Sequence, residues 1–349
     1  MNRLTYISSF SKSTSLKDIR EIGRISEVNN ARDNLTGVLL CFRGVFYQII
    51  EGEERDIDRC FERIKADPRH DDIFILNIEK NISHRMYVEW KMKTVFLDDQ
   101  KYPLIMPIRN LLDSLTKTHQ ILTQYVPKEI LKGIQSGSEP QTWGFKREDL
   151  VVMFSDLLCF TTITEKIDLP GMQELLYTYF EIASKNIQDS GGSIGKLTGD
   201  GFMAYYPIEK ANAALQAGAG IIKALGMQRK QSGSPFVKLA YCGIGISAGT
   251  VVQGNVGSTK RQDYTLLGDV VNSASRLESY TRETGHALLF DQGLHKYLRQ
   301  EDQFNILDLG EHMLKGKTKK SQIYTLDDPE LLFDKSTAEI ATAIGDIQM

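Results

Sequence analysis

The stretch QSGSEPQTWG, in the middle of the chain, most constrains how this protein can fold. Its Gly, Ser and Pro residues favour turns over regular structure, so it marks a boundary near residues 133–146. On both sides of it, short apolar runs alternate with amphipathic segments, which is the pattern of strands and helices. A chain of 349 residues is long enough for two domains with separate cores. We therefore expect two domains of mixed α and β structure, joined by a linker.

The first domain reads as a small α/β sandwich. A strand at RLTYIS precedes an amphipathic helix that begins near Ser15. The strands LTGVLLCF and VFYQIIEG follow, and Gly44 between them can take the positive φ of a tight hairpin. A second helix ends at Pro68, and the strand IFILNIEKNI comes after it. This β-α-β-β-α-β order predicts a ferredoxin-like domain.

The apolar period changes between Pro103 and Pro127. Apolar residues then recur in alternating steps of four and three, with His119 filling one slot, which predicts a short coiled coil between two chains. A single amphipathic helix lying on its own domain accounts for the same pattern. The positions concerned are Ile108, Leu112, Leu115, Leu122 and Val126.

Composition excludes several classes of function. The 42 Lys and Arg residues nearly balance the 45 Asp and Glu residues, so the chain lacks the basic surface of a nucleic-acid or membrane-binding protein. No apolar run approaches the roughly 18 residues of a membrane span, and the N-terminus has no apolar signal segment. We expect a cytoplasmic protein that binds small molecules or a second copy of itself. Its widely spaced cysteines are expected to be reduced and buried: Cys41, Cys60, Cys159 and Cys242.

Two acidic residues of the second half lie where a metal could bind. The strand VVMFSD ends at Asp156 and leads into a helix, whose exposed N–H groups attract phosphate while the carboxylate holds a cation against it. Asp200 lies in a hairpin, in the sequence TGDG between two apolar stretches. Taken singly, Asp156 is equally well a helix cap and Asp200 an ordinary turn residue.

Four segments, in order, resemble the class III nucleotidyl cyclase family across residues 148–290: FSDLLCFTT, GGSIGKLTGDGFMA, GIGISAGTVVQGNVGS and DYTLLGDVVNSASRLE. The chain departs from the family at Cys159, where glycine is usual. The resemblance implies an α/β catalytic domain with a ferredoxin-like core. It also implies the family's reaction, in which the ribose 3′-oxygen of a nucleoside triphosphate attacks the α-phosphorus and pyrophosphate leaves.

The resemblance implies a role for each matching residue. Asp156, Asp200 and the carbonyl of Leu157 would hold two Mg²⁺ or Mn²⁺ ions per site, and the amides of Phe160 and Thr161 would meet the phosphates. On the predicted helix DVVNSASRLE, Asn272 would position the ribose and Arg276 would stabilise the charge of the transition state. Candidates for the outer phosphates, with helpers, are Lys315 and Lys317, with Lys260 or Arg261.

Two further positions read the base in this family. Adenine offers an acceptor at N1 and a donor at N6, and Lys196 and Thr265 match these needs. A guanylyl cyclase would carry an acid at the Lys196 position, so ATP is favoured over GTP. In the family each site forms across a head-to-tail dimer, one chain giving the carboxylates and the other the base-reading residues. The resemblance therefore implies a homodimer.

Residues 1–98 resemble the BLUF family of blue-light sensors through Tyr6 and the segments NNARDNLTGVLL, VFYQIIEGE, DPRHDDI and EWKMKT. The resemblance implies a bound flavin, FAD or FMN, with Tyr6 and Gln48 facing its ring, Asn30 at its polar edge and Met92 near Gln48. Burying the Gln48 amide in an apolar strand without partners would cost about 1–3 kcal/mol, which a cofactor would remove. In the family, light moves an electron and a proton from the tyrosine to the flavin, and the glutamine amide rotates or tautomerises.

We therefore expect a homodimeric, blue-light-activated adenylyl cyclase. The expected division is a sensor at residues 1–98, a coiled-coil linker at 99–147, a catalytic domain at 148–328 and a tail at 329–349. Two alternatives remain, a light-regulated guanylyl cyclase and a non-catalytic flavin photoreceptor whose cyclase-like domain only dimerises. The joint presence of Asp156, Asp200, Asn272 and Arg276 argues against the second.

Overall fold

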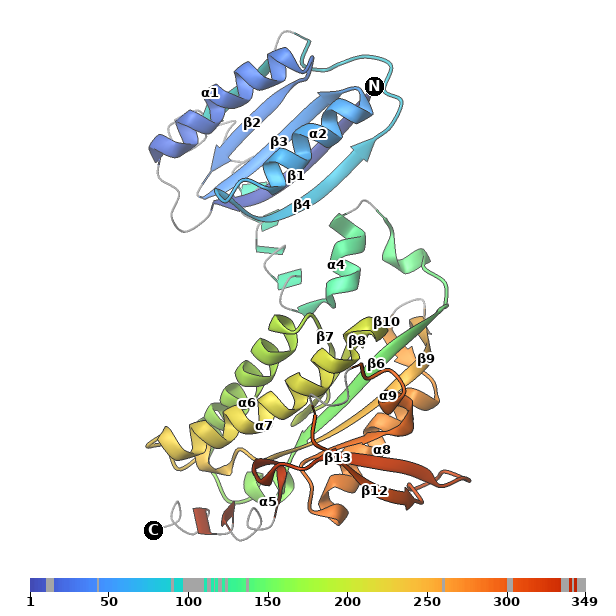
Figure 1. Ribbon diagram of the computed structural model, residues 1–349. Coiled ribbons are helices and arrows are strands. Elements are labelled where there is room, and N and C mark those ends of the chain that lie inside the picture. Colours follow the sequence, from blue (N-terminus) through green and yellow to red (C-terminus); the bar gives the residue numbers. More distant parts are fainter. Residues whose placement is uncertain are drawn as a thin grey trace. The chain divides into compact units, whose positions relative to one another are not determined.

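The computed structural model divides into two compact units, Met1–Thr142 and Trp143–Met349 (Figure 1). Each unit is described by itself. No helix of the described residues is long and apolar enough to cross a membrane. The described residues are 1–10, 16–42, 44–88, 91–96, 110–111, 114–115, 117–118, 121–122, 125–135, 138–258, 261–299, 304–333, 339–340 and 342–343.

The first unit is built on one sheet with the strand order β4-β1-β3-β2-β5. Strands β1 to β4 pair antiparallel, and β5 adds to β2 in parallel. This is the ferredoxin-like arrangement, so the predicted fold is confirmed, and Gly44 turns the β2–β3 hairpin at φ 83°. The elements are β1 Asn2–Phe10, α1 Leu16–Arg32, β2 Thr36–Phe42, β3 Val45–Gly52, α2 Glu54–Lys65, β4 His70–Glu79, β5 Lys91–Phe96 and α4 Lys128–Gln135.

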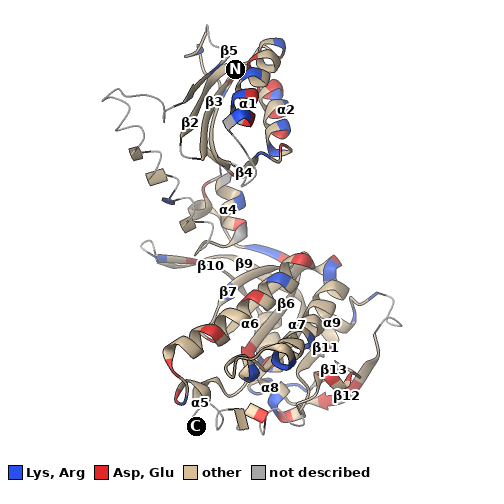
Figure 2. Cartoon of the chain, turned by 90° about the vertical axis from the view of Figure 1, so that its left-hand side faces the viewer, with Lys and Arg blue, Asp and Glu red and all other residues tan. Residues whose placement is uncertain are grey.

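Helices α1 and α2 cover one face of this sheet (Figure 1). Along α2, Ile57, Cys60 and Phe61 are buried at the three- and four-residue spacing that aims one helical face at the sheet. They pack against Tyr6 of β1 and Phe46 of β3, both of which are fully buried. Burial of one such aromatic side chain contributes about 1.5–3 kcal/mol. The outer faces of both helices intersperse charges of both signs (Figure 2).

The opposite face of the sheet carries part of the predicted linker. Leu115 packs against a cluster formed by Ile7, Val45 and Phe74, and Ile134 of α4 packs against the same cluster. One seam position, Leu115, therefore contacts its own domain, as in the alternative of a single helix lying on that domain. Of the other seam positions, Leu122 and Val126 are half-buried. Ile108, Leu112 and His119 lie outside the described residues, and the coiled coil stays a prediction.

The second unit contains a larger sheet with the order β12-β13-β11-β9-β6-β8-β7, and β10 pairs with β9. Its strands β9-β6-β8-β7 repeat the ferredoxin-like order of the first unit, which confirms the predicted core. The elements are β6 Lys146–Leu157, α5 Phe160–Thr164, α6 Leu169–Asp189, β7 Ser193–Leu197, β8 Gly201–Pro207, α7 Ala211–Gln231, β9 Cys242–Ser258, β10 Arg261–Leu267, α8 Asp269–Thr284, β11 Leu288–Asp291, α9 Gln292–His295, β12 Ile306–His312 and β13 Ser321–Leu326.

The two faces of this sheet are covered by different helices (Figure 1). Successive residues of a strand point to opposite faces. On β6, Val151 and Met153 face the core beneath α6 and α7, whereas Val152 joins a second cluster with Ala274 of α8. Helix α8 sits close to β9, because a Cβ on Gly245 would lie 2.1 Å from the backbone nitrogen of Glu278.

The chain enters the second unit along the β9–β10 hairpin. The ring of Trp143 meets that of Tyr264 edge-on, with centroids 5.5 Å apart, and the Trp143 carbonyl accepts a hydrogen bond from the Asn255 side chain. Phe145 fills the space that Gly254 leaves open on β9. Trp143 and Phe145, near the end of the predicted linker, therefore pack against the hairpin that carries Thr265.

The C-terminal tail, to which the sequence assigned no role, contributes to the core of the second unit. Leu331, Ile340 and Ala343 are buried there. The Leu331 carbonyl accepts a hydrogen bond from the amide of Ala287, and the side chain of Glu339 accepts one from the hydroxyl of Tyr241. In the sequence, Ile340, Ile344 and Ile347 recur at helical spacing, but a segment this short does not indicate which surface it packs against.

The cysteine prediction is right for three residues and wrong for one. Cys41, Cys60 and Cys242 are buried, Cys159 is exposed, and no disulfide joins these four described residues. Cys159 is exposed because it precedes α5 in a surface turn. Its φ of 57° is left-handed, a conformation that favours the glycine usual in the family. The cysteine side chain costs about 1–2 kcal/mol there.

Candidate functional site

Asp156 lies at the end of β6 between two glycines. In the strand register its partners are Gly201 of β8 on one side and Gly243 of β9 on the other. A Cβ on Gly201 would lie 2.7 Å from Oδ1 of Asp156, and one on Gly243 would lie 2.4 Å from Oγ1 of Thr281. Bare backbone on both sides therefore leaves room around the Asp156 carboxylate.

Asp200 is brought to Asp156 by the hairpin that joins β7 and β8. Gly199 turns the chain at φ 79°, and the amide of Thr198 donates to the carbonyl of Gly201 at 2.8 Å. The amide of Leu157 donates to the carbonyl of Asp200 at 3.3 Å, which fixes the turn against the end of β6. Burial and the neighbouring Asp200 carboxylate raise the pKa of Asp156 to about 7.

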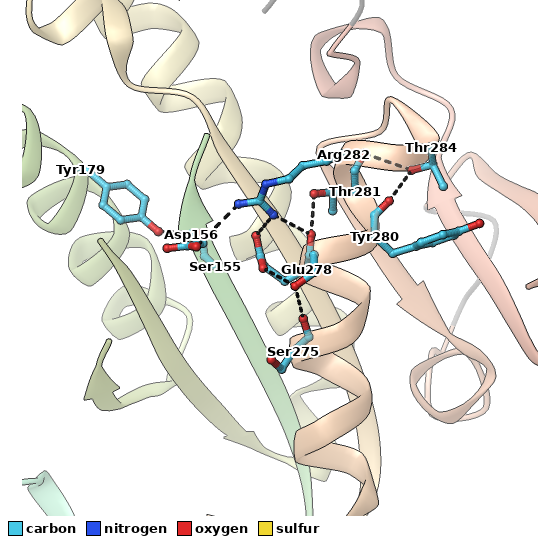
Figure 3. A network of polar contacts seen from close by, with 10 residues as sticks. Ser155, Asp156, Tyr179, Ser275, Glu278, Tyr280, Thr281, Arg282 and Thr284 are labelled. Atoms are coloured by element: carbon cyan, nitrogen blue, oxygen red, sulfur yellow. Dashed lines mark hydrogen bonds and ion pairs between the residues drawn. The ribbon is translucent and has the colours of Figure 1, made fainter. Parts of the chain in front are cut away.

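Two residues that the sequence did not indicate complete this acidic centre (Figure 3). Nη2 of Arg282 lies 3.6 Å from Oδ2 of Asp156, and Nη1 of Arg282 donates to Oε1 of Glu278 at 2.6 Å. Both belong to the last turns of α8, four residues apart on one face. The Glu278 carboxyl is buried, and burial raises its pKa. Their signal in the sequence is Gly243 and Gly245, two residues apart on β9, which mark a strand face smooth enough for close helix packing.

The arrangement fits a divalent cation. Among the described residues no group of three or more His, Cys, Asp or Glu side chains forms a metal site. The Asp156 and Asp200 carboxylates lie close enough to repel one another, and a cation relieves that repulsion. Mg²⁺ is commonly held by one or two carboxylates, with water and substrate phosphate completing its shell. The carbonyl of Leu157, beside Asp156, is an additional oxygen donor.

The turn after Asp156 presents the backbone expected to meet phosphate. Helix α5 begins at Phe160 without a side-chain cap, so the amides of Phe160 and Thr161 belong to its uncapped first turn. The amide of Leu158 donates to the carbonyl of Tyr241 at 2.8 Å, and the amide of Ile163 donates to the carbonyl of Cys159 at 2.9 Å. These bonds hold the turn next to the end of β6 that carries Asp156.

Arg276 and Asn272 lie on α8, as predicted, but Arg276 is not directed at the chain's own carboxylates. The guanidinium of Arg276 lies 3.3 Å from where Gly316 would carry a Cβ. Glu278, two residues further, is about 200° around the helix and faces β9. Within one chain, Arg276 and the Asp156 centre therefore occupy opposite sides of α8.

The LKGK segment supplies one more positioned cation. Nζ of Lys317 donates to Oδ2 of Asp269 at 2.7 Å, at the start of α8. Lys315 is exposed in the same turn. Arg261 is exposed at the start of β10, where its amide donates to the Ser258 hydroxyl. Lys260 lies outside the described residues.

The predicted base-reading residues lie on β7 and β10. Nζ of Lys196 pairs with Oδ2 of Asp263, and Thr265 is half-buried two residues along the same face of β10. The structure thus places Lys196 beside the strand that carries Thr265. Asp263 was not predicted, because its pairing with Lys196 joins strands 67 residues apart in sequence.

In the first unit, Tyr6 and Gln48 are paired. They face each other in the β1–β3 register, both are buried, and the Tyr6 hydroxyl donates to Oε1 of Gln48. Burial raises the pKa of the Tyr6 hydroxyl well above its ordinary value, so the neutral phenol is the stable form. Gln48 is therefore a buried strand residue and does not face solvent.

A cavity between α1 and α2 is lined by Gln48, Asn30, Cys60, Arg69 and His70. Oδ1 of Asn30 accepts from Sγ of Cys60 at 3.6 Å, but its Nδ2 is buried without a partner. A buried unpaired donor costs about 1–3 kcal/mol, and an acceptor on a bound ring would satisfy it. The chemistry of this lining therefore suits a ring that carries acceptor atoms, such as a flavin. Met92 belongs to β5, but the structure describes only its backbone and not its side chain.

Comparison with known families divides the chain as its two units do. Residues 1–93 match the family described as BLUF, sensors of blue-light using FAD, and residues 145–328 match the adenylate and guanylate cyclase catalytic domain. A solved bacterial light-regulated adenylyl cyclase is 37% identical, covers all of this chain and 99% of its own, and has a TM-score of 0.89.

Curated relatives include two photoactivated adenylate cyclase proteins of Euglena gracilis. The subunit beta-like protein FB is 30% identical and subunit alpha is 29% identical, each over 339 residues that make up 95% of this chain. The chain spans only 38% and 32% of their respective lengths. The chain belongs to the adenylate and guanylate cyclase catalytic domain family, with a blue-light sensor domain of the BLUF family in front of the catalytic domain.

Proposed function

We propose that this protein is a blue-light-activated adenylyl cyclase that converts ATP to 3′,5′-cyclic AMP and pyrophosphate. The observation that carries the proposal is the joint occurrence, in one chain, of the Asp156–Asp200 centre and the buried Tyr6–Gln48 pair beside an unpartnered Asn30 amide. The first suits phosphoryl chemistry and the second suits a flavin. The solved light-regulated adenylyl cyclase, similar over its whole length, supports the combination.

In the proposed reaction the chain's residues bind and orient ATP. Asp156, Asp200 and the Leu157 carbonyl would hold two Mg²⁺ ions, which would supply activation of the ribose 3′-oxygen and neutralise the charge of the triphosphate. The amides of Phe160 and Thr161 contact phosphate. Because Arg276 faces away from its own chain's carboxylates, the site is completed by Asn272 and Arg276 of a second copy, which makes a homodimer part of the mechanism.

ATP is proposed as the substrate because Lys196 and Thr265 together offer a donor and an adaptable hydroxyl to adenine. Asp263 holds the Lys196 ammonium in place.

Sensing is assigned to residues 1–98, coupling to 99–147 and catalysis to 148–328. A bound FAD would absorb the blue light. The Tyr6–Gln48 pair, joined by a hydrogen bond, is the part of the protein that we propose responds to this absorption. The cytoplasmic location stays a prediction.

The test uses the purified full-length protein. We expect a visible flavin spectrum and cyclic AMP formation from ATP and Mg²⁺ that rises under blue light. Asp156→Asn and Asp200→Asn should each abolish cyclic AMP formation and leave the flavin spectrum unchanged. Near-normal turnover in either variant would contradict the metal assignment, and faster turnover of GTP than of ATP would favour a guanylyl cyclase.

A further inference from the structure

Within the part of the chain that the structure describes, Arg282 forms an ion pair with the acidic centre. Its guanidinium lies between the carboxylates of Asp156 and Glu278, and Figure 3 shows it bridging β6 and α8. Asp200 adds a third acidic group beside Asp156. One guanidinium therefore faces two carboxyl groups, and the side chains of Arg282 and Asp156 are each 37% exposed.

The two partners of Arg282 hold it differently. Glu278 binds it tightly, through a 2.6 Å contact with a buried carboxyl and a weaker 3.4 Å contact with the Glu278 carbonyl. Asp156 lies at 3.6 Å, beyond hydrogen-bond distance, so this second interaction is mainly electrostatic. Glu278 thus holds the guanidinium on α8 by a hydrogen bond, whereas Asp156, the expected metal ligand, attracts it only electrostatically.

The anchor depends on the glycines of β9. Oε1 of Glu278 lies 3.1 Å from where Gly243 would carry a Cβ, so any side chain at 243 would push the Glu278 carboxyl away. Gly243 is also the strand partner of Asp156. The same bare backbone therefore frees the Asp156 carboxylate and admits the Glu278–Arg282 pair next to it.

We propose that Arg282 is a positioning residue that serves as the resident counter-ion of the Asp156–Asp200 centre and competes with divalent metal for it. This inference rests on the proposed function, because it takes these carboxylates as the metal ligands. A fixed positive charge within a few ångströms stabilises the ionised carboxylates while metal is absent, and it repels an incoming dication. Glu278 limits that repulsion by holding the guanidinium on α8.

The experiment measures Mn²⁺ binding to the full-length flavin-loaded protein in the dark without nucleotide, by electron paramagnetic resonance of free Mn²⁺. Arg282→Met, which keeps the apolar stem, should bind Mn²⁺ more tightly by about tenfold. Its thermal midpoint without metal should fall, because the carboxyl groups of Asp156 and Glu278 lose their cation. Arg59→Met is the matched control, since it breaks an exposed helical ion pair with Asp56 and should change neither metal affinity nor the effect of metal on stability.

Further variants separate the outcomes. Glu278→Gln should weaken Mn²⁺ binding, the opposite sign to Arg282→Met, because it releases the guanidinium toward Asp156. Arg282→Gln repeats the charge removal should the methionine variant not fold. One outcome would overturn this inference and leave the proposed function standing: Asp200→Asn abolishes Mn²⁺ binding, but the Mn²⁺ affinity is the same with and without Arg282. Absence of any Asp200-dependent binding, in the unaltered protein and in Arg282→Met alike, would count against the metal site itself.

Discussion

The backbone nitrogen of Glu278 lies 2.1 Å from where Gly245 would carry a Cβ. No real side chain tolerates that distance, so β9 and α8 pack backbone against backbone at this point. The contact holds the last turns of α8, with Glu278 and Arg282, over the end of β6. It also predicts which glycine of the second unit is least replaceable.

Gly245→Ala should destabilise the catalytic unit by about 3 kcal/mol, because the new methyl group meets backbone atoms that cannot rotate away. Gly233→Ala is the control, since no atom lies within 4 Å of the added Cβ and its φ is not left-handed. That variant should stay within about 0.5 kcal/mol of the unaltered protein. Urea denaturation followed by circular dichroism measures both, and equal midpoints for the two variants would contradict the close packing.

Tyr6→Phe should retain flavin and dark cyclase activity but lose the response to blue light. The change removes the hydroxyl that donates to Gln48, at a cost of about 0.5–1.5 kcal/mol, so the fold survives. The light-minus-dark flavin spectrum and cyclic AMP production are measured on one sample. Tyr47→Phe, at the neighbouring position of β3 on the opposite face, should respond to light normally. A Tyr6→Phe protein that still shifts its spectrum and gains activity would remove Tyr6 from the response, and loss of flavin would make it a structural residue.

Lys196→Glu combined with Thr265→Gly should move substrate preference toward GTP, by about tenfold or more, because an acid accepts from guanine N1–H and N2–H and rejects the adenine acceptor. The structure adds a condition. The new carboxylate would face Asp263, the present partner of Lys196, and like charges would repel. Adding Asp263→Asn should therefore strengthen the switch. The measurement is the rate of cyclic nucleotide formation from ATP relative to that from GTP. Unchanged ATP selectivity in the triple variant would mean that other residues read the base.

His70 should make the sensor unit sensitive to acid. Its ring is buried, its Nδ1 is hydrogen-bonded to Ser8, and burial lowers its pKa to about 4. Because the unfolded chain takes up this proton near pH 6.5, stability is complete above that pH and is lost as pH falls toward 4. Between pH 7 and 5 the loss is about 2 kcal/mol.

The measurement for His70 is urea denaturation of the full-length protein at pH 7 and pH 5, followed through the flavin signal of the sensor unit. The His70→Asn variant keeps a polar group near Ser8 without a titrating ring, so it should lose about 2 kcal/mol less over this interval. An identical pH dependence in both proteins would show that His70 is not protonated on unfolding.

The fold and the first set of site residues were predictable because their signals are local. The apolar periods specify the β-α-β-β-α-β order of the sensor. Asp156 ends an apolar strand, and Asp200 lies in a Gly-Asp-Gly turn. Gln48 drew attention as an amide within an apolar strand, and it is indeed buried.

The remaining site residues depend on packing between distant segments. The pairing of Lys196 with Asp263 needs the placement of β10 against β9, and the approach of Arg282 to Asp156 needs the bare glycine face of β9. Neither contact leaves a periodic pattern in its own segment. The burial of Ile340 in the tail was missed for a related reason, because the helical spacing of Ile340, Ile344 and Ile347 does not indicate which core the tail packs against.

The close contact between α8 and β9 also limits how such an enzyme can be regulated. Asp156 on β6 and Arg276 on α8 are both attached to this contact, so their spacing within one chain is effectively constant. We therefore expect illumination to change the offset between the carboxylates of one copy and the guanidinium of the other. In the proposed dimer, the distance between the two catalytic units should then differ between the dark and lit states more than any distance inside one of them.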